Sequence, residues 1–309
     1  MAVGYASGKV ILFGEHAVVY GRPAIAVPVT QVQARAEVED AGQGQGITIV
    51  ARDLGQTYTL SEAPPDDALR TIIVNTLERT RVGLEHDLTI TITSTIPVAR
   101  GLGSGAAVST AIVRALLKHF DRWLDSRAIS DLVFETEKIY HGTPSGIDNT
   151  VIAFEKPVYF VKGERMEIFW VERPFLLAIA DTGVQSPTKV AVEDVRRAWE
   201  REPVMYEGLF DDIGTIAEMG RRAIEQGDLE VMGRLMNENQ RLLRLLKVSS
   251  PELEGLIGAA RQGGALGAKL SGAGRGGNMI ALVTPETCSQ VSMMLRLAGA
   301  RNVIVTEVG

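Results

Sequence analysis

A glycine-rich segment, Pro97–Ala107 (PVARGLGSGAA), has the residue types that most directly indicate chemistry. Its glycines allow positive φ angles and let the backbone approach a ligand closely. The residues that follow, up to Phe120, place apolar side chains at helical spacing. The segment therefore leads into a helix N-terminus, where free N–H groups and the positive end of the helix dipole favour a phosphate group. It predicts a phosphate-binding loop.

Two other glycine-containing segments approximate known phosphate motifs, and their context excludes both. Gly4–Lys9 (GYASGK) has one residue fewer between its glycines than a Walker A motif, and Val10 stands where that motif needs a serine or threonine. Gly272–Gly277 (GAGRGG) has the dinucleotide-binding spacing. The apolar run that begins at Asn278 predicts a strand, whereas the dinucleotide fold needs a helix there.

Three further segments carry charged and hydroxyl side chains. Lys9–Gly21 places a lysine and a Glu-His pair around a short apolar strand. Glu137–Asp148 begins and ends on carboxylates, the first late in a predicted helix and the second after a Pro-Ser-Gly loop. Asp181–Lys189 gathers hydroxyl side chains after a predicted strand. Each feature taken alone is more often structural, so only their joint occurrence argues for a site. A cation, a base and oriented amides are the groups that phosphoryl transfer needs.

The composition excludes several classes of protein. The chain is acidic, with a net charge of −6 and no basic stripe, so we expect neither a nucleic-acid partner nor an anionic-membrane partner. A single cysteine, Cys288, excludes a disulfide framework. The 4 histidines lack metal-ligand spacing. No apolar run approaches the ~18 residues of a membrane span and no signal peptide is evident, so we expect a cytoplasmic protein.

The order of predicted elements indicates an α+β protein of two domains, 1–173 and 174–309, with a shift in composition near Arg173. Short β-rich runs predict strands at Lys9–Phe13, Ala24–Pro28, Gln31–Val38, Ile47–Val50, Thr57–Leu60, Asp87–Thr95, Pro157–Val161, Glu167–Trp170, Phe175–Ala180, Ala268–Ser271, Met279–Val283 and Val303–Val308. Helical periodicity predicts helices at Ala106–Phe120, Ile129–Tyr140, Thr188–Trp199, Tyr206–Gln226, Asp228–Leu246, Pro251–Gln262 and Pro285–Ala298, with another helix beginning after Thr143–Asp148.

The chain resembles the GHMP kinases, the family named for galactokinase, homoserine kinase, mevalonate kinase and phosphomevalonate kinase. The five segments that carry the resemblance occur in the family's order: Lys9–Gly21, Pro97–Ala107, Glu137–Asp148, Asp181–Lys189 and Gly272–Gly277. The resemblance extends over essentially the whole chain. It implies a two-domain fold with an N-terminal domain like ribosomal protein S5 domain 2 and a ferredoxin-like C-terminal domain. KVILFGEHAVVYG, EKIYHGTPSGIDN and DTGVQSPTK are most similar to the members that act on mevalonate. The implied reaction is ATP-dependent phosphorylation of the mevalonate 5-hydroxyl. The resemblance also implies a homodimer.

The resemblance also implies a role for individual residues. Asp148 would accept the proton of the attacking hydroxyl, and Lys9 would stabilise the transferred charge. Ser104 and Glu137 would hold Mg²⁺. Glu15, His16 and Thr188 would line the mevalonate side, with Gly272–Gly277 as a further glycine loop against the site. Besides Lys9, the residues that would contact ATP are Val98, Ala99, Arg100, Gly101, Leu102, Gly103, Ser104, Gly105, Ala106 and Ala107.

The chain departs from the family pattern at a few positions, and other functions stay open. Gly105 stands where a second serine is usual, and Arg100 where a small residue is usual. Arg275 and Asn278 occupy positions that are commonly glycine and a small residue. One alternative is a sibling kinase that acts on phosphomevalonate, homoserine or a sugar. Another is a non-catalytic metabolite sensor, which would be expected to lose the base or the lysine, whereas this chain has both.

Overall fold

The chain divides into two compact units, each discontinuous in sequence. The computed structural model describes residues 1–97, 101–141, 144–164, 166–185 and 188–309. The first unit is Met1–Gly8, Val32–Val98 and Leu102–Glu155, and the second is Lys9–Gln31, Ala99–Gly101 and Lys156–Gly309. The long strands β1 (Ala2–Phe13) and β2 (Ala24–Asp40) give residues to both. The single boundary near Arg173 stays a prediction about folding domains.

The sheet of the first unit has the strand order β4-β3-β5-β2. The strands β3 (Ile47–Ala51) and β5 (Leu88–Ser94) are parallel, whereas β4 (Gln56–Thr59) is antiparallel to β3. Residues 34–40 of β2 pair antiparallel with β5. Burial alternates along β5, as expected for a strand with one face on the core. The strictly alternating run from Asp87 to Thr95 is therefore confirmed as a half-buried strand.

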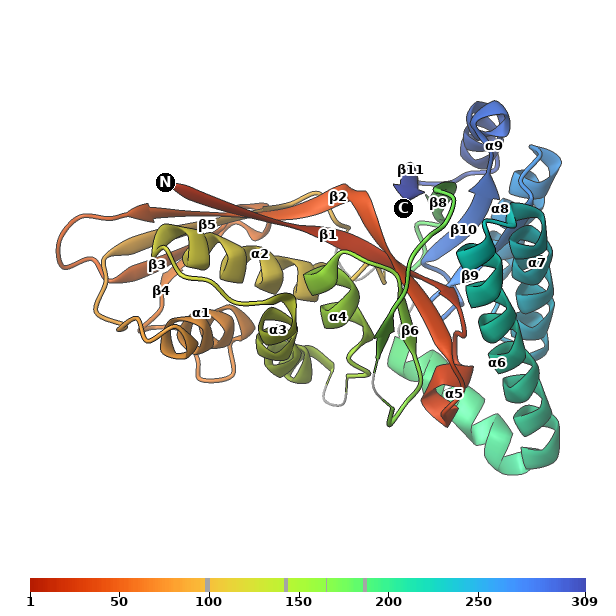
Figure 1. Ribbon diagram of the computed structural model, residues 1–309, viewed down its shortest axis with the longest axis horizontal. Coiled ribbons are helices and arrows are strands. Elements are labelled where there is room, and N and C mark those ends of the chain that lie inside the picture. Colours follow the sequence, from red (N-terminus) through yellow and green to blue (C-terminus); the bar gives the residue numbers. More distant parts are fainter. Residues whose placement is uncertain (98–100, 142–143, 165, 186–187) are drawn as a thin grey trace. The chain divides into compact units, whose positions relative to one another are not determined.

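The first unit also contains four helices that pack on one another. They are α1 (Ala68–Arg79), α2 (Ser104–His119), α3 (Ser126–His141) and α4 (Ile147–Phe154). Figure 1 shows α1, α2 and α3 side by side, and α2 also contacts β5. Small residues allow close packing here, because a Cβ on Gly4 of β1 would lie 2.2 Å from the Ala111 carbonyl oxygen of α2. The helix α1 was not among the predicted helices, although Asp67 caps its first turn by accepting a hydrogen bond from the Arg70 amide.

The second unit contains an antiparallel sheet of order β11-β8-β10-β9. Its strands are β8 (Phe175–Asp181), β9 (Gly267–Ser271), β10 (Asn278–Val283) and β11 (Asn302–Val308). The helices of this unit are α5 (Thr188–Arg201), α6 (Pro203–Gln226), α7 (Leu229–Leu245), α8 (Pro251–Gln262) and α9 (Pro285–Leu297). Helices α7 and α8 run beside β9, and α9 packs on β8, β10 and β11 (Figure 1). The strand–strand–helix–strand arrangement predicted for the C-terminal region is confirmed.

Short elements complete the fold. The strand β6 (Val158–Phe160) pairs with Ala24–Ala26 of β2 and with β7 (Glu167–Ile168). Two 3₁₀ helices, η1 (Ala17–Tyr20) and η2 (Arg52–Leu54), follow β1 and β3. No helix in the described ranges has the length and apolar character that crossing a membrane requires.

Two strands are longer than predicted. The strand β1 starts at Ala2, so Gly4–Lys9 is extended backbone and not a phosphate loop. The strand β2 is one strand of 17 residues where Pro28 suggested two. Pro28 lies between the segment that pairs with β6 and the segment that pairs with β5, so its missing N–H interrupts neither of these two pairings. The strand β10 begins at Asn278, which confirms that Gly272–Gly277 leads into a strand.

Candidate active site

The helix α2 begins where the glycine loop ends. Ser104 is its first residue, and Gly103 precedes it in the left-handed conformation with φ 75°. Gly101 has φ 76°, so two loop positions have a backbone that glycine adopts without strain. The amides of the first helical turn lack carbonyl partners within the helix, which suits an anion. The predicted transition from loop to helix is confirmed at these positions, while Val98, Ala99 and Arg100 lie outside the described residues.

The carboxylate of Glu137 lies in the interior of the first unit. Glu137 is 3% exposed and belongs to α3, one position after Thr136. The Thr136 and Ser109 hydroxyls are 3.1 Å apart, which joins this part of α3 to α2. Burying an ionised carboxylate costs free energy unless hydrogen bonds, a cation or a metal compensate the charge. The position therefore suits a residue whose charge has a function.

Asp148 lies in the first turn of α4. The residue before this helix, Gly146, has φ 87°, and Thr150 donates to its carbonyl oxygen at 2.8 Å. The Asn149 amide donates to the carbonyl oxygen (3.1 Å) and the hydroxyl (2.9 Å) of Ser130, which fixes this turn on α3. A carboxylate at a helix N-terminus is favoured by the dipole.

The first unit therefore places Ser104, Glu137 and Asp148 on helices that pack against one another, α2, α3 and α4. Both ligands proposed for the metal offer hard oxygen atoms, a hydroxyl and a carboxylate, which are the donors Mg²⁺ prefers. Within the described ranges no group of three or more His, Cys, Asp and Glu side chains could hold a metal. That finding is compatible with Mg²⁺, which is commonly held by one or two protein carboxylates together with substrate phosphates and water.

The second unit contains the Glu-His pair at the end of β1. Lys9 lies within β1 and is 5% exposed. The turn after the strand is tight: Gly14 has φ 94°, and a Cβ there would lie 2.4 Å from the Pro23 carbonyl oxygen. Glu15 and His16 follow and are buried. The turn therefore directs two polar side chains into the interior of the unit.

Glu15 forms a buried ion pair with Lys269 of β9. The Lys269 ammonium donates to the Glu15 carboxylate and, at 2.6 Å, to the Leu270 carbonyl oxygen. Both side chains are at most 1% exposed. Burial raises the pKa of Glu15 and lowers the pKa of Lys269, and the attraction between the two opposes both shifts. Sequence reasoning missed Lys269; the signal was a lysine in an otherwise apolar strand.

The His16 ring is held by the glycine loop that follows β9. Its Nε2 lies 2.9 Å from the Ala273 carbonyl oxygen. Since a carbonyl can only accept, Nε2 must carry the proton. Burial lowers the pKa of His16 to about 4, and the Arg275 charge adds a smaller effect in the same direction. The ring is therefore neutral near pH 7, with Nδ1 as the nitrogen that can accept a hydrogen bond.

Three segments that the sequence analysis singled out meet in the second unit. The Ser271 hydroxyl donates to the Ile11 carbonyl oxygen (2.8 Å) and accepts from the Ile11 amide (3.1 Å), which joins β1 to β9. The Gly277 amide donates to the Val184 carbonyl oxygen at 2.9 Å, which joins the Gly272–Gly277 loop to the segment after β8. One side-chain hydroxyl and one backbone hydrogen bond therefore hold these segments together.

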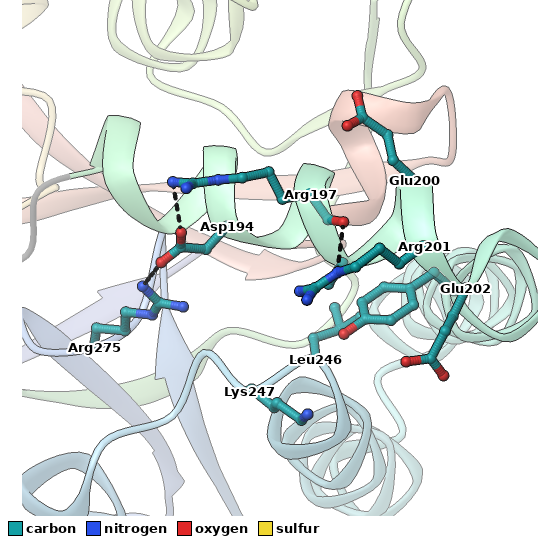
Figure 2. Close-up of a pocket in the computed structure, with 10 residues that line it drawn as sticks. Asp194, Arg197, Glu200, Arg201, Glu202, Leu246, Lys247 and Arg275 are labelled. Carbon is teal, nitrogen blue, oxygen red and sulfur yellow. Dashed lines mark hydrogen bonds and ion pairs between the residues drawn. The ribbon is translucent and has the colours of Figure 1, made fainter.

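Thr188 is the first residue of α5 and is exposed. Its predicted place at a helix start is confirmed, whereas Ser186 and Pro187 lie outside the described residues. Beside α5 lies a cavity of about 690 Å³ (Figure 2). Its lining residues come from α5, α6, the end of α7 and the glycine loop: Asp194, Arg197, Ala198, Glu200, Arg201, Glu202, Tyr206, Leu246, Lys247 and Arg275.

Comparison with known proteins identifies relatives over nearly the whole chain. The family descriptions "GHMP kinases N terminal domain" and "GHMP kinases C terminal" match residues 69–156 and 221–296. A mevalonate kinase of Thermococcus sibiricus is 36% identical, with 97% of this chain and 94% of that protein covered. One from Aeropyrum pernix is 34% identical, with coverages of 90% and 87%.

Solved structures agree with these relatives. The L. major mevalonate kinase in complex with R-mevalonate has a TM-score of 0.86 and 29% identity, covering 100% of this chain and 96% of that one. The Methanococcus jannaschii mevalonate kinase has a TM-score of 0.85 at 25% identity, covering 99% and 96%. A Streptococcus pneumoniae phosphomevalonate kinase, at 18% identity and a TM-score of 0.83 with both chains fully covered, shares the fold.

Breaking the buried ion pair tests its contribution to stability. We expect Lys269→Met to lower the free energy of unfolding by about 3–5 kcal/mol, because it leaves the Glu15 carboxylate buried without its partner. The double variant Glu15→Gln, Lys269→Met should recover most of that loss. Lys189→Met, at an exposed position of α5, is the control and should change stability by less than about 0.5 kcal/mol. The measurement is urea unfolding followed by circular dichroism; a Lys269→Met protein as stable as wild type contradicts the expectation.

Proposed function

Because the chain belongs to the GHMP kinase family and, within it, to the mevalonate kinases, we propose that it transfers the γ-phosphoryl group of ATP to the 5-hydroxyl of mevalonate. The observation that carries the proposal is the 36% identity to a mevalonate kinase over 97% of this chain. The products are 5-phosphomevalonate and ADP. The residues proposed below for each step rest on the family resemblance together with their burial and their positions in the fold.

Asp148 is the proposed base. Its carboxylate accepts the proton of the 5-hydroxyl while the hydroxyl oxygen bonds to the γ-phosphorus and the bond to the β-phosphate oxygen breaks. The hydrogen bonds from Asn149 and Thr150 hold this turn of α4 in place, which supports a role based on orientation. Orientation matters more than basicity in this reaction, because phosphoryl transfer depends mainly on positioning and charge stabilisation.

Lys9 and the start of α2 are the proposed sources of positive charge. Lys9 is a lysine of the strand β1 and is only 5% exposed, which supports a role for an ammonium that is positioned before substrate arrives. The amides at the start of α2 and the loop from Val98 to Ala107 bind the ATP phosphates in this proposal. Charges and dipoles that are already oriented stabilise a transition state without reorganising during the reaction.

Ser104 and Glu137 would hold Mg²⁺, which when bound neutralises charge that develops on the phosphate oxygens. Glu137 supplies a full negative charge from a buried position, whereas Ser104 supplies a neutral hydroxyl at the first residue of α2. We therefore assign the larger part of metal affinity to Glu137.

His16 and Thr188 are proposed to bind mevalonate. A neutral His16 ring with its proton on Nε2 leaves Nδ1 as an acceptor for a substrate hydroxyl. Thr188 offers a hydroxyl at the beginning of α5, where the helix dipole favours a carboxylate. The carboxylate of Glu15 binds Lys269, which supports a role in holding the turn that carries His16.

The acceptor itself is tested with a panel of alcohols. ADP release by the purified protein should depend on mevalonate, and phosphomevalonate, homoserine and galactose should give at most a few per cent of that rate. The physical reason is that a pocket built to pair with one substrate's polar groups rejects analogues that leave those groups unpaired. A faster rate with another acceptor would replace mevalonate by that acceptor, and no turnover with any of them would favour a sensor.

Asp148→Asn tests the base. We expect kcat to fall by about 10³-fold or more with ATP binding preserved, because the amide cannot accept the proton. Asp131→Asn is the matched control, since Asp131 is an exposed carboxylate of α3 that pairs with Arg127. Steady-state kinetics and nucleotide titration measure both effects. A kcat within about tenfold of wild type, ~1.4 kcal/mol in the barrier, would remove Asp148 from the role.

Glu137→Gln tests the metal ligand. The substitution removes one charge and keeps the shape, so the Mg²⁺ concentration that gives half-maximal activity should rise by about tenfold or more. Glu135→Gln, two residues earlier on α3 and half exposed beside Lys138, should leave the titration unchanged. Identical Mg²⁺ titrations for Glu137→Gln and wild type would place the metal elsewhere.

A further inference from the structure

Arg275 has a backbone conformation that is unusual for its residue type. Its φ is 59°, in the left-handed region, and among the described residues only six that are not glycine have positive φ. Glycine adopts this conformation without the steric cost that a side chain brings. An arginine in such a position of a glycine-rich loop needs a compensating contact.

The Arg275 side chain makes that contact with α5. Its guanidinium donates to the Asp194 carboxylate, and the pair lies in the cavity shown in Figure 2. Asp194 also pairs at 2.9 Å with Arg197, which lies on the same helix. The hydrogen bond from Arg275 lowers the pKa of Asp194, so the carboxylate is ionised at neutral pH. Of the two arginines, only Arg275 links Asp194 to another segment of the chain.

The loop that carries Arg275 is anchored on two further sides. The Arg275 amide donates to the Val248 carbonyl oxygen at 2.6 Å, after the end of α7. A Cβ on Gly274 would lie 2.0 Å from that same oxygen. On the other side the Gly277 amide donates to Val184. The backbone is thus held by the segment after α7 and by the segment after β8. The Arg275 side chain adds the only link to α5 among the contacts described for the loop.

Two residues proposed to bind the acceptor are attached to this loop and to α5. His16 donates to the Ala273 carbonyl oxygen, two positions before Arg275, so its ring follows the loop. Thr188 begins α5, the helix that carries Asp194. A shift of the loop relative to α5 that kept the His16–Ala273 hydrogen bond would move His16 relative to Thr188.

We propose that the Arg275–Asp194 ion pair positions the acceptor-binding side by locking the Gly272–Gly277 loop to α5, which fixes His16 against Thr188. The inference rests on the proposed function for the identity of the acceptor. Arg275 is a positioning residue here, because it acts through the loop and the helix. The pair sets the affinity for the acceptor and leaves ATP binding to other parts of the chain.

The decisive variant is Arg275→Gly, because glycine takes this φ without strain and the arginine side chain, with its ion pair, is lost. The KM for mevalonate should rise by about tenfold, equivalent to ~1.4 kcal/mol, while the KM for ATP changes by less than about twofold. Asp194→Asn should act in the same direction. Arg197→Ala is the matched control: it removes a second arginine from the same carboxylate without touching the loop, and it should leave both constants within about twofold of wild type.

Charge reversal separates positioning from direct binding. The double variant Arg275→Asp, Asp194→Arg restores an ion pair between the loop and α5, so its KM for mevalonate should return to within about threefold of wild type. If Arg275→Gly raises this KM and the reversal does not restore it, Arg275 contacts the acceptor itself, and the positioning role is overturned. An unchanged KM in Arg275→Gly, equal changes for both substrates, or an equal effect of Arg197→Ala also overturns it.

Amide hydrogen exchange without substrate gives a readout independent of activity. The amides of residues 275 and 277, which donate to Val248 and Val184, should exchange about tenfold faster in Arg275→Gly and Asp194→Asn, and at the wild-type rate in Arg197→Ala. Unchanged exchange in all three variants contradicts the lock. If exchange is faster in Arg275→Gly and Asp194→Asn but the wild-type protein does not phosphorylate mevalonate, the ion pair does hold the loop on α5 and the proposed function is wrong. The two failures are therefore distinguishable.

Discussion

Burial of charged side chains is the constraint on which the rest of the structure depends. Lys9, Glu15, Lys269 and Glu137 are each at most 5% exposed, and a charge in such a place is costly unless it is compensated. Glu15 and Lys269 compensate each other, and in doing so they join the turn after β1 to β9 across a long stretch of sequence. A pair of this kind adds little net stability compared with apolar residues, so its value lies in fixing one geometry.

The glycine loop Gly272–Gly277 and His16 are positioned next to this ion pair by further hydrogen bonds. The Ser271 hydroxyl binds both backbone groups of Ile11, and two residues further on Ala273 accepts from the His16 ring. Glycine at 274 is required because any Cβ would collide with the Val248 carbonyl oxygen. Close backbone contact at Gly274 therefore adds to the side-chain hydrogen bonds of Ser271 and His16 in holding the loop. A surface built this way is largely formed before any ligand arrives, and preformed surfaces bind at a lower free-energy cost.

The sequence predicted the fold class, the element order and most of the candidate site. Strict alternation located β5, and helical periodicity located α2 and α5 to α9, because these patterns record which face is buried. The loop from Gly101 to Ser104 was predictable because its glycines and the following helix are local features. Prediction failed where local signals were weak or misleading. The helix α1 has a mixed polar sequence with a single capping aspartate, and Pro28 suggested a break in β2 that tertiary pairing overrides.

The sequence by itself determined the chemical groups and their order along the chain: a lysine, a glycine-rich loop before a helix, two carboxylates and a hydroxyl at a helix start. Only the tertiary structure decided which charges compensate one another. Lys269 was an unremarked lysine in an apolar strand until folding placed it against Glu15, and Arg275 was a departure from a glycine pattern until folding placed it against Asp194. The physical reason is that periodicity and loop glycines depend on neighbouring residues, whereas an ion pair between residues 254 positions apart depends on how separate elements pack.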